Sequence, residues 1–255
     1  MAEKGTAHEG ALGKTPIAHL LVYAMERQLT GVLFVAPVGA AAETAVRLAR
    51  GVPVKVRSGD GYALLGRMLV EAGAISEKTL EDALSTKGLL GDVLLLAGCI
   101  DQRRLEDVAL QQFVRRVVHL FELGPEARFR YEDGSVELLD WGGEAANVDP
   151  LYLLWQGVRA HGSSALEPML AAFAATPLRL HAAAPVGRFG FDDDERMLVD
   201  HLAATAASVD ELAAFDLVPA ERVRRLDYLL AITRALDLGA AGTLPVGVAA
   251  RTASA

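Results

Sequence analysis

Residues 64–76, LLGRMLVEAGAIS, recur with few changes at residues 89–101, LLGDVLLLAGCID. The two segments begin 25 residues apart, and each is followed at the same distance by a leucine, Leu80 in the first copy and Leu105 in the second. Within each copy the apolar residues recur at the spacing of one helical face, and a glycine follows them. The repetition predicts that one structural unit is built twice.

Each copy carries the signals of a helix, a tight stop and a second helix. Gly73 and Gly98 would take the left-handed position just past a helix end, where a Cβ atom is strained. Ser76 and Asp101 then follow at the N-cap of the next helix. An apolar residue on each side of the cap would form a hydrophobic staple, which fixes the angle between the two helices. The staple pairs are Ile75 with Leu80 and Ile100 with Leu105. The sequence therefore predicts two stacked helical hairpins.

The segments around the repeats predict a small antiparallel sheet. A helical pattern at 15–31 precedes a short β-rich run at 32–37, and residues 45–57 alternate as in a hairpin. One more strand is expected at 127–134. Because the helical block at 62–123 interrupts the strands, the first and last parts of this region should close one sheet. The fold class is therefore predicted to be α+β.

Residues 134–150 are rich in turn formers and end in a proline, which marks a domain boundary. Helical patterns follow this stretch up to residue 238. We therefore predict a disordered N-terminus at 1–13, an α+β domain at 14–138, a linker at 139–149, a helical domain at 150–238 and a disordered tail at 239–255.

The composition narrows the possible partners. Hydrophobic residues make up 52% of the chain, and the formal net charge is −8. This charge argues against general binding of nucleic acid or anionic membrane, both of which need clustered positive charge. The single cysteine, Cys99, excludes an internal disulfide, and no apolar run approaches the roughly 20 residues of a membrane span. We expect a soluble, cytoplasmic protein.

No catalytic or metal-binding pattern is found in the sequence. The six histidines form no pair at helical spacing, and there is no phosphate-binding loop or dinucleotide fingerprint. The acidic run at 192–195 precedes a helical pattern, where carboxylates favour the positive end of the helix. We interpret this run as a solvated helix cap. The sequence predicts no enzyme, no metal and no cofactor.

The first half of the chain resembles the PATAN domain family. The resemblance rests on the TGVLFV strand at 30–35, the GVPV turn at 51–54, the paired LG segments, and the aromatic strand with Phe129 and Tyr131. It covers roughly residues 14–138. It implies a non-enzymatic role in bacterial signalling through protein–protein contacts, in systems that control motility or polarity. Residues 150–238 are similar to the segment that follows this domain, and they resemble a winged-helix module.

The repeats are also similar to the N-terminal domain of type II secretion and pilus ATPases, some of which bind cyclic di-GMP. The resemblance implies that the nucleotide would approach the backbone at four glycines and a later glutamine. These residues are Gly66, Gly73, Gly91, Gly98 and Gln112. The leading arginine of that motif is replaced by Leu64 and Leu89, which cannot pair with phosphate. Nucleotide sensing is therefore an alternative hypothesis.

Two groups of basic residues are candidates for contact with a partner. Four of them alternate with apolar residues in the predicted hairpin and are expected on its solvent face. Three others lie on the last predicted helix, where they could read DNA or form salt bridges. Residues 149–240 carry eight Lys or Arg against thirteen Asp or Glu, which disfavours DNA. The candidates are Arg47, Arg50, Lys55 and Arg57 in the hairpin, and Arg222, Arg224 and Arg225 in the helix.

These observations lead to one main hypothesis, a non-enzymatic cytoplasmic signalling adaptor that acts by presenting a surface to a protein partner. A cyclic di-GMP-sensing module and a DNA-binding regulator that uses the C-terminal domain are the two alternatives.

Overall fold

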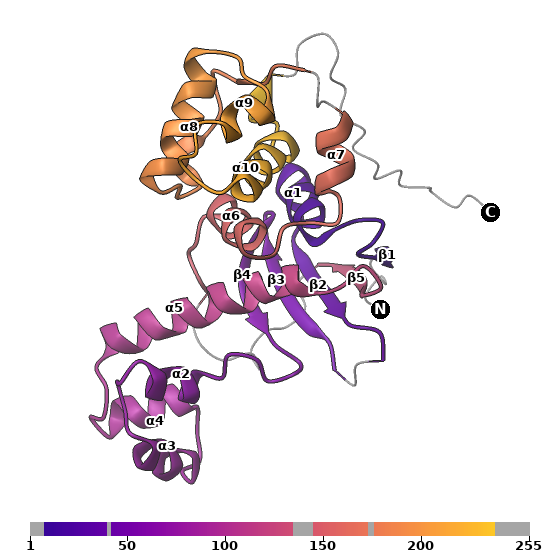
Figure 1. Cartoon of the computed structure of the whole chain (residues 1–255). Coiled ribbons are helices and arrows are strands. Elements are labelled where there is room, and N and C mark those ends of the chain that lie inside the picture. Colours follow the sequence, from indigo (N-terminus) through magenta and orange to yellow (C-terminus); the bar gives the residue numbers. More distant parts are fainter. Residues whose placement is uncertain (1–7, 40–41, 135–144, 173–175, 238–255) are drawn as a thin grey trace, which may run out of the picture.

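The computed structural model describes residues 8–39, 42–134, 145–172 and 176–237. Over these residues the chain forms ten α-helices and a five-stranded antiparallel sheet, with a further pair of very short strands. The mixed helix and sheet content agrees with the predicted α+β class. Figure 1 shows the sheet at the centre, helices above it, and a group of helices projecting from one end.

The large sheet has the strand order β1-β5-β2-β3-β4. β2 (Gly31–Ala36), β3 (Thr44–Ala49) and β4 (Val52–Arg57) follow each other as antiparallel neighbours. β5 (Arg128–Asp133) returns from beyond the repeats and pairs with β2, with Leu33 opposite Tyr131. The strand after the repeats therefore completes the sheet, as the order of the segments predicted.

The fifth strand corrects the expectation of a disordered N-terminus over the described part of that segment. Residues 1–7 lie outside the described residues, but β1 (His8–Ala11) pairs with β5, and Leu12 is buried behind it. The sequence HEGA has little β-propensity of its own. Its strand conformation comes from the unpaired edge of β5, whose backbone groups offer hydrogen bonds to any neighbouring segment.

Two helices cover one face of the sheet (Figure 1). α1 (Ile17–Arg27) and α6 (Pro150–His161) pack against each other and onto the side of the sheet that bears Leu33, Val46 and Tyr131. The centre of this layer is Trp155, which has no exposed surface. The helices and the sheet thus form two layers that bury one hydrophobic core between them.

The C-terminal helices join this same core. Buried residues of α8 and α10 belong to one continuous hydrophobic cluster with those of the sheet. The predicted linker lies outside the described residues at 139–144, and at 145–149 it is irregular chain in which the Ala146 amide donates to the Val54 carbonyl of β4. The buried residues are thus not divided at the predicted boundary. The elements here are α7 (Leu166–Ala172), β6 (Arg179–Leu180), η3 (Val186–Arg188), α8 (Asp193–Ala204), α9 (Val209–Ala213), α10 (Ala220–Ile232) and β7 (Leu236–Asp237).

The repeats form a second, separate cluster of buried residues. The helices are α2 (Leu65–Glu71), α3 (Glu77–Leu84), α4 (Leu90–Leu96) and the first half of α5 (Gln102–His119). We call residues 63–112 the repeat module and the rest of the described chain the body. Leu69, Leu94 and Val108 lie at the centre of the module, and each is fully buried.

α5 connects the module to the body. Its residue Val108 belongs to the module core, whereas Phe113 and Val117 pack against Leu153 of α6. The helix continues into the short η1 (Leu120–Glu122) beneath α6. Figure 1 shows α2, α3 and α4 gathered around the outer end of α5, far from the C-terminal helices.

Over the described residues, the helices are all too short or too polar to cross a membrane.

Candidate interaction surface on the repeat module

The stops and caps of the two hairpins confirm the local predictions. Gly73 and Gly98 take positive φ angles of 63° and 65° after α2 and α4. The Ser76 hydroxyl accepts a hydrogen bond from the Thr79 amide at 3.1 Å. In the second copy the Asp101 carboxylate accepts from the Arg104 amide at 2.7 Å. One of the orphan amides at the start of each new helix is thereby satisfied, and the two copies share the same turn geometry.

Two of the four glycines proposed to approach a nucleotide, Gly66 and Gly91, face leucines of the module itself. A Cβ atom added to Gly66 would lie 2.5 Å from Leu80 Cδ1, and one added to Gly91 would lie 3.1 Å from Leu105 Cδ2. The stapling leucines therefore fill the space that the missing side chains leave. Gly66 and Gly91 allow close helix packing here, because a side chain at either position would push the leucine away.

Gln112, the remaining nucleotide candidate, holds the chain that enters the module. Its side-chain Nε2 donates a hydrogen bond to the Ala63 carbonyl at 2.7 Å. One turn further along α5, Arg116 Nε donates to the Tyr62 carbonyl at 3.1 Å and Nη1 to the Val56 carbonyl at 3.2 Å. These bonds pin the segment between β4 and α2 onto α5, so Gln112 has a structural partner.

The outer face of α4 is apolar and uncovered. Leu89, Asp92 and Leu96 follow each other at intervals of three and four residues, so they share one side of the helix. Leu94, the fully buried residue of α4, points to the other side. The exposed fraction is 55% for Leu89 and 89% for Leu96. Two leucines exposed on the same side of one helix form an apolar surface that packing within the described residues does not cover.

At the equivalent positions of the first copy, charged side chains form ion pairs within the chain. Leu64 corresponds to Leu89 and is similarly exposed, but the residues that correspond to Asp92 and Leu96 are charged. Arg67 pairs with Glu77 at 2.8 Å, and Glu71 pairs with Arg115 at 3.2 Å. The two copies thus share a fold and differ in their outer surface. We call the surface formed by Leu84, Leu89, Asp92 and Leu96 the α4 face.

Three of the four hairpin candidates lie on one face of the sheet. Arg47 stands opposite Lys55 and Ala45 opposite Arg57, so the three basic side chains leave from the same side of β3 and β4. Each of them already takes part in an interaction within the chain. Arg50 is an exception to the predicted alternation: it lies in the turn with φ of 49°, and its amide donates to the Thr30 hydroxyl at 3.0 Å.

The arginines of α10 are used inside the body. Arg222 lies 3.5 Å from the Asp192 carboxylate, Arg224 pairs with Glu167, and Arg225 pairs with Glu221. α10 itself packs against α6, α7 and α9, and eight of its thirteen residues are buried. A helix enclosed in this way does not offer its length to a DNA groove.

The acidic run at the start of α8 is only partly the solvated cap that the sequence predicted. Asp193 and Asp194 are exposed, but Glu195 has no exposed surface. Asp192 and Glu195 form a capping box at the start of the helix. Their spacing of three residues is the sequence signal of a capping box. The spacing does not predict that the carboxylate of Glu195 is buried against Trp155.

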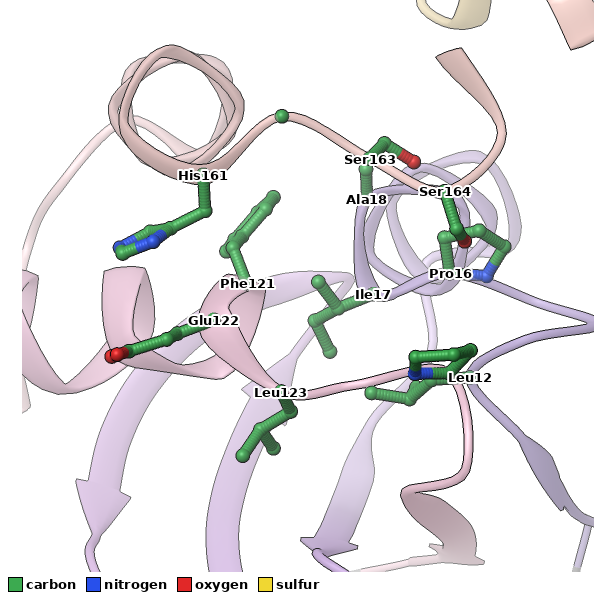
Figure 2. A pocket seen from close by; sticks show the side chains of 12 residues that line it. Leu12, Pro16, Ile17, Ala18, Phe121, Glu122, Leu123, His161, Ser163 and Ser164 are labelled. Atoms are coloured by element: carbon green, nitrogen blue, oxygen red, sulfur yellow. The ribbon is translucent and has the colours of Figure 1, made fainter. Parts of the chain in front are cut away.

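A pocket of about 260 Å³ lies between η1, the start of α1 and the end of α6. Figure 2 shows His161 and Glu122 on one side of it and Ser164 on the other, with Ile17 and Phe121 between them. This volume is below the range of about 300–1,000 Å³ that is usual for small-molecule sites. Within the described residues, no three acidic, His or Cys side chains gather to hold a metal.

Comparisons of the chain with protein-family models, with curated proteins and with solved structures gave no match.

Proposed function

We propose that this protein is a non-enzymatic signalling adaptor, and that the repeat module presents a surface to a protein partner. The observation that carries the proposal is the contrast between a module with its own buried core and the apolar side chains on its outside. A self-contained rigid body with an exposed apolar face is suited to binding another protein.

The arrangement of the body adds to this proposal. The α10 arginines and three of the hairpin cations, Arg47, Lys55 and Arg57, are engaged within the chain, and the pocket beside η1 is small. The repeat module, by contrast, projects from the body (Figure 1), so a partner can approach it from several sides. The body then acts as the support that holds the module in place.

We further propose that residues 14–138 form a PATAN-like domain of a cytoplasmic bacterial signalling protein, in a system that governs motility or polarity. The return of β5 to β2 around the inserted repeats supports this assignment. Residues 150–238 are proposed to contain a winged-helix-like unit. The sequence of α8, α9 and α10 with the β6–β7 pair and the Leu178–Ala207 bridge supports it.

Cyclic di-GMP sensing and DNA binding remain testable alternatives. The contacts of Gly66 and Gly91 with leucines favour packing over nucleotide binding at the repeats. Titration calorimetry of the full chain with cyclic di-GMP should give no binding heat. A gel shift with random duplex DNA should give no complex at any salt concentration, because the chain is acidic.

The adaptor proposal is tested by quantitative affinity capture of the full-length tagged protein from its native cells. We expect at least one protein to be enriched reproducibly in a fixed ratio to the bait. Absence of any such protein, or turnover of a small molecule by the purified chain, would contradict the proposal.

A further inference from the structure

The first copy of the repeat provides a reference for the α4 face of the second copy, because both copies form a helix, a glycine stop and a capped second helix. Positions 67 and 71 of the first copy hold charges that are paired within the chain, whereas positions 92 and 96 hold a free carboxylate and an exposed leucine. Folding alone does not require the leucine, since the first copy folds with Glu71 at the equivalent place. The apolar residue at position 96 therefore calls for an explanation outside the fold.

Further apolar surface continues from α4 onto the end of α3. Leu84 is the last residue of α3 and is 65% exposed, and the short loop from it leads to Leu89. Leu89 and Leu96 are separated by two helical turns, or about 10 Å. Leu89 and Leu96 thus offer a stripe that an amphipathic helix buries through residues at every third or fourth position, and Leu84 adds exposed apolar surface at the other end of the loop.

The charges beside this stripe specify the kind of partner. Glu81 and Asp92 form no ion pair with any residue that the structure describes, and Lys87 is the one basic residue in the loop between Leu84 and Leu89. Glu81 precedes Leu84 by one helical turn, and Asp92 lies between Leu89 and Leu96. The repeat module as a whole carries five Lys or Arg against eight Asp or Glu, a formal net charge of −3. Complementary charge on the partner is positive.

We propose that the α4 face docks an amphipathic helix of another protein, which lays apolar side chains on Leu84, Leu89 and Leu96 and brings Lys or Arg to Glu81 and Asp92. This inference rests on the proposed adaptor function and identifies the surface and the chemistry of the partner. The helix gains apolar burial along the stripe and charge-assisted contacts at its rim.

The negative charge of the module argues against two other partners for the α4 face, a second copy of this chain and an anionic membrane. A second copy would bring the same free carboxylates to the interface, and like charges placed together are unfavourable. An anionic membrane surface attracts basic segments, but this module and the entire chain are acidic. A basic helix is therefore the occupant that the surface fits.

Site-specific photo-crosslinking of the full chain in its native cells tests the proposal. A photoreactive phenylalanine analogue is introduced in place of Leu96, in place of the equivalent Glu71 of the first copy, or in place of Arg57 on the sheet. We expect a defined protein adduct from position 96 and none from position 71. Mass spectrometry of the adduct should identify a helical segment with apolar residues flanked by Lys or Arg.

The outcomes separate this inference from the adaptor function. An adduct from position 57 without one from position 96 would leave an adaptor but overturn the α4 face as its site. An adduct from position 96 with an acidic segment, with lipid or with a second copy of this chain would overturn the proposed occupant. The lack of a protein adduct at all three positions, together with an empty affinity capture, would contradict both proposals.

A direct binding measurement provides a second test. The probe is a fluorescent amphipathic helical peptide built from Leu and Lys, followed by anisotropy with the full chain. We expect Leu96→Glu and Leu89→Ser each to weaken binding about tenfold. The first substitution introduces the residue that the first copy has at the equivalent position, Glu71. Leu64→Ser is the matched control and should leave the affinity unchanged. Equal affinity of all three variants and the unaltered chain would overturn the proposal.

Discussion

The indole Nε1 of Trp155 donates a hydrogen bond to the Glu195 carboxylate at 3.0 Å, and both side chains are fully buried. The bond joins α6 to the start of α8. Arg159 of α6 approaches the same carboxylate at 3.3 Å. Glu195 also closes the capping box of α8 by accepting from the Asp192 amide at 3.0 Å. One carboxylate oxygen thus accepts hydrogen bonds from a tryptophan and a helix end, while the other lies within ion-pair distance of an arginine.

Loss of the Glu195 carboxylate should therefore strongly destabilise the folded protein. Glu195→Ala is expected to lower the free energy of unfolding by about 3–5 kcal/mol, because it leaves buried partners without an acceptor. Glu195→Gln keeps an acceptor for Trp155 and should cost less. Asp194→Ala, at the exposed neighbouring position, should change stability by less than about 0.5 kcal/mol. Urea unfolding followed by circular dichroism measures all three, and equal effects of Glu195→Ala and Asp194→Ala would argue against the buried network.

Asp227 should make the stability depend on pH. The carboxylate of this α10 residue is buried and has no hydrogen-bond partner among the residues that the structure describes, and burial raises its pKa from 3.8 to about 8. The folded chain therefore keeps a proton that the unfolded chain releases. The stability linked to this proton is complete below about pH 4 and is lost as the pH rises to about 8.

The isosteric variant Asp227→Asn separates this contribution from the rest. It should match the unaltered protein near pH 4 and exceed its stability by several kcal/mol at pH 8, because it cannot ionise. Asp200→Asn, at an exposed position of α8, should show no such trend. Urea unfolding across this pH range gives the comparison. A stability gain from Asp227→Asn that is the same at pH 4 and pH 8 would contradict the raised pKa.

The two leading glycines of the repeats should differ in their tolerance of a methyl group. Gly66→Ala meets Leu80 and also Leu90 at close range, and it is expected to cost about 1–3 kcal/mol. Gly91→Ala meets Leu105 at 3.1 Å and should cost less. Amide hydrogen exchange should accelerate in α2, α3 and α4 and stay unchanged in the sheet. Equal costs at the two positions would show that the leucines move aside freely.

Gly157 tests whether the C-terminal half shares its core with the sheet. Helix propensity alone predicts that Gly157→Ala gains about 1 kcal/mol. A Cβ atom at this position would overlap the ring of Phe121 in η1, so we expect a loss of about 1–3 kcal/mol instead. The double variant Gly157→Ala/Phe121→Leu should recover part of this loss in thermal unfolding. A rise in melting temperature for Gly157→Ala would mean that α6 does not pack on η1.

The local parts of the fold could be predicted from the sequence. The helix stops and caps depend only on residues within one or two helical turns, so the local sequence is enough to predict them. They lie at Gly73, Gly98, Ser76 and Asp101. The antiparallel sheet followed from alternation and from the position of the helical block between its strands. These features need only neighbouring residues and the order of segments.

Features that depend on distant contacts could not be predicted in this way. β1 forms because β5 leaves an edge open, and the burial of Glu195 depends on Trp155 forty residues earlier. The outward position of Leu96 is also invisible in a run of apolar residues, where every leucine is a candidate for the core. Only the three-dimensional comparison with Glu71 in the first copy sets it apart.

The separate core of the repeat module has an evolutionary consequence. The module enters after β4 and leaves along α5, and its central leucines do not belong to the cluster that stabilises the sheet. Its outer residues can therefore diversify by substitution, or the whole insert can be exchanged for a related one, without redesign of the scaffold beneath it. Under the proposed adaptor function, the surface that binds a partner and the scaffold that supports it would then change independently.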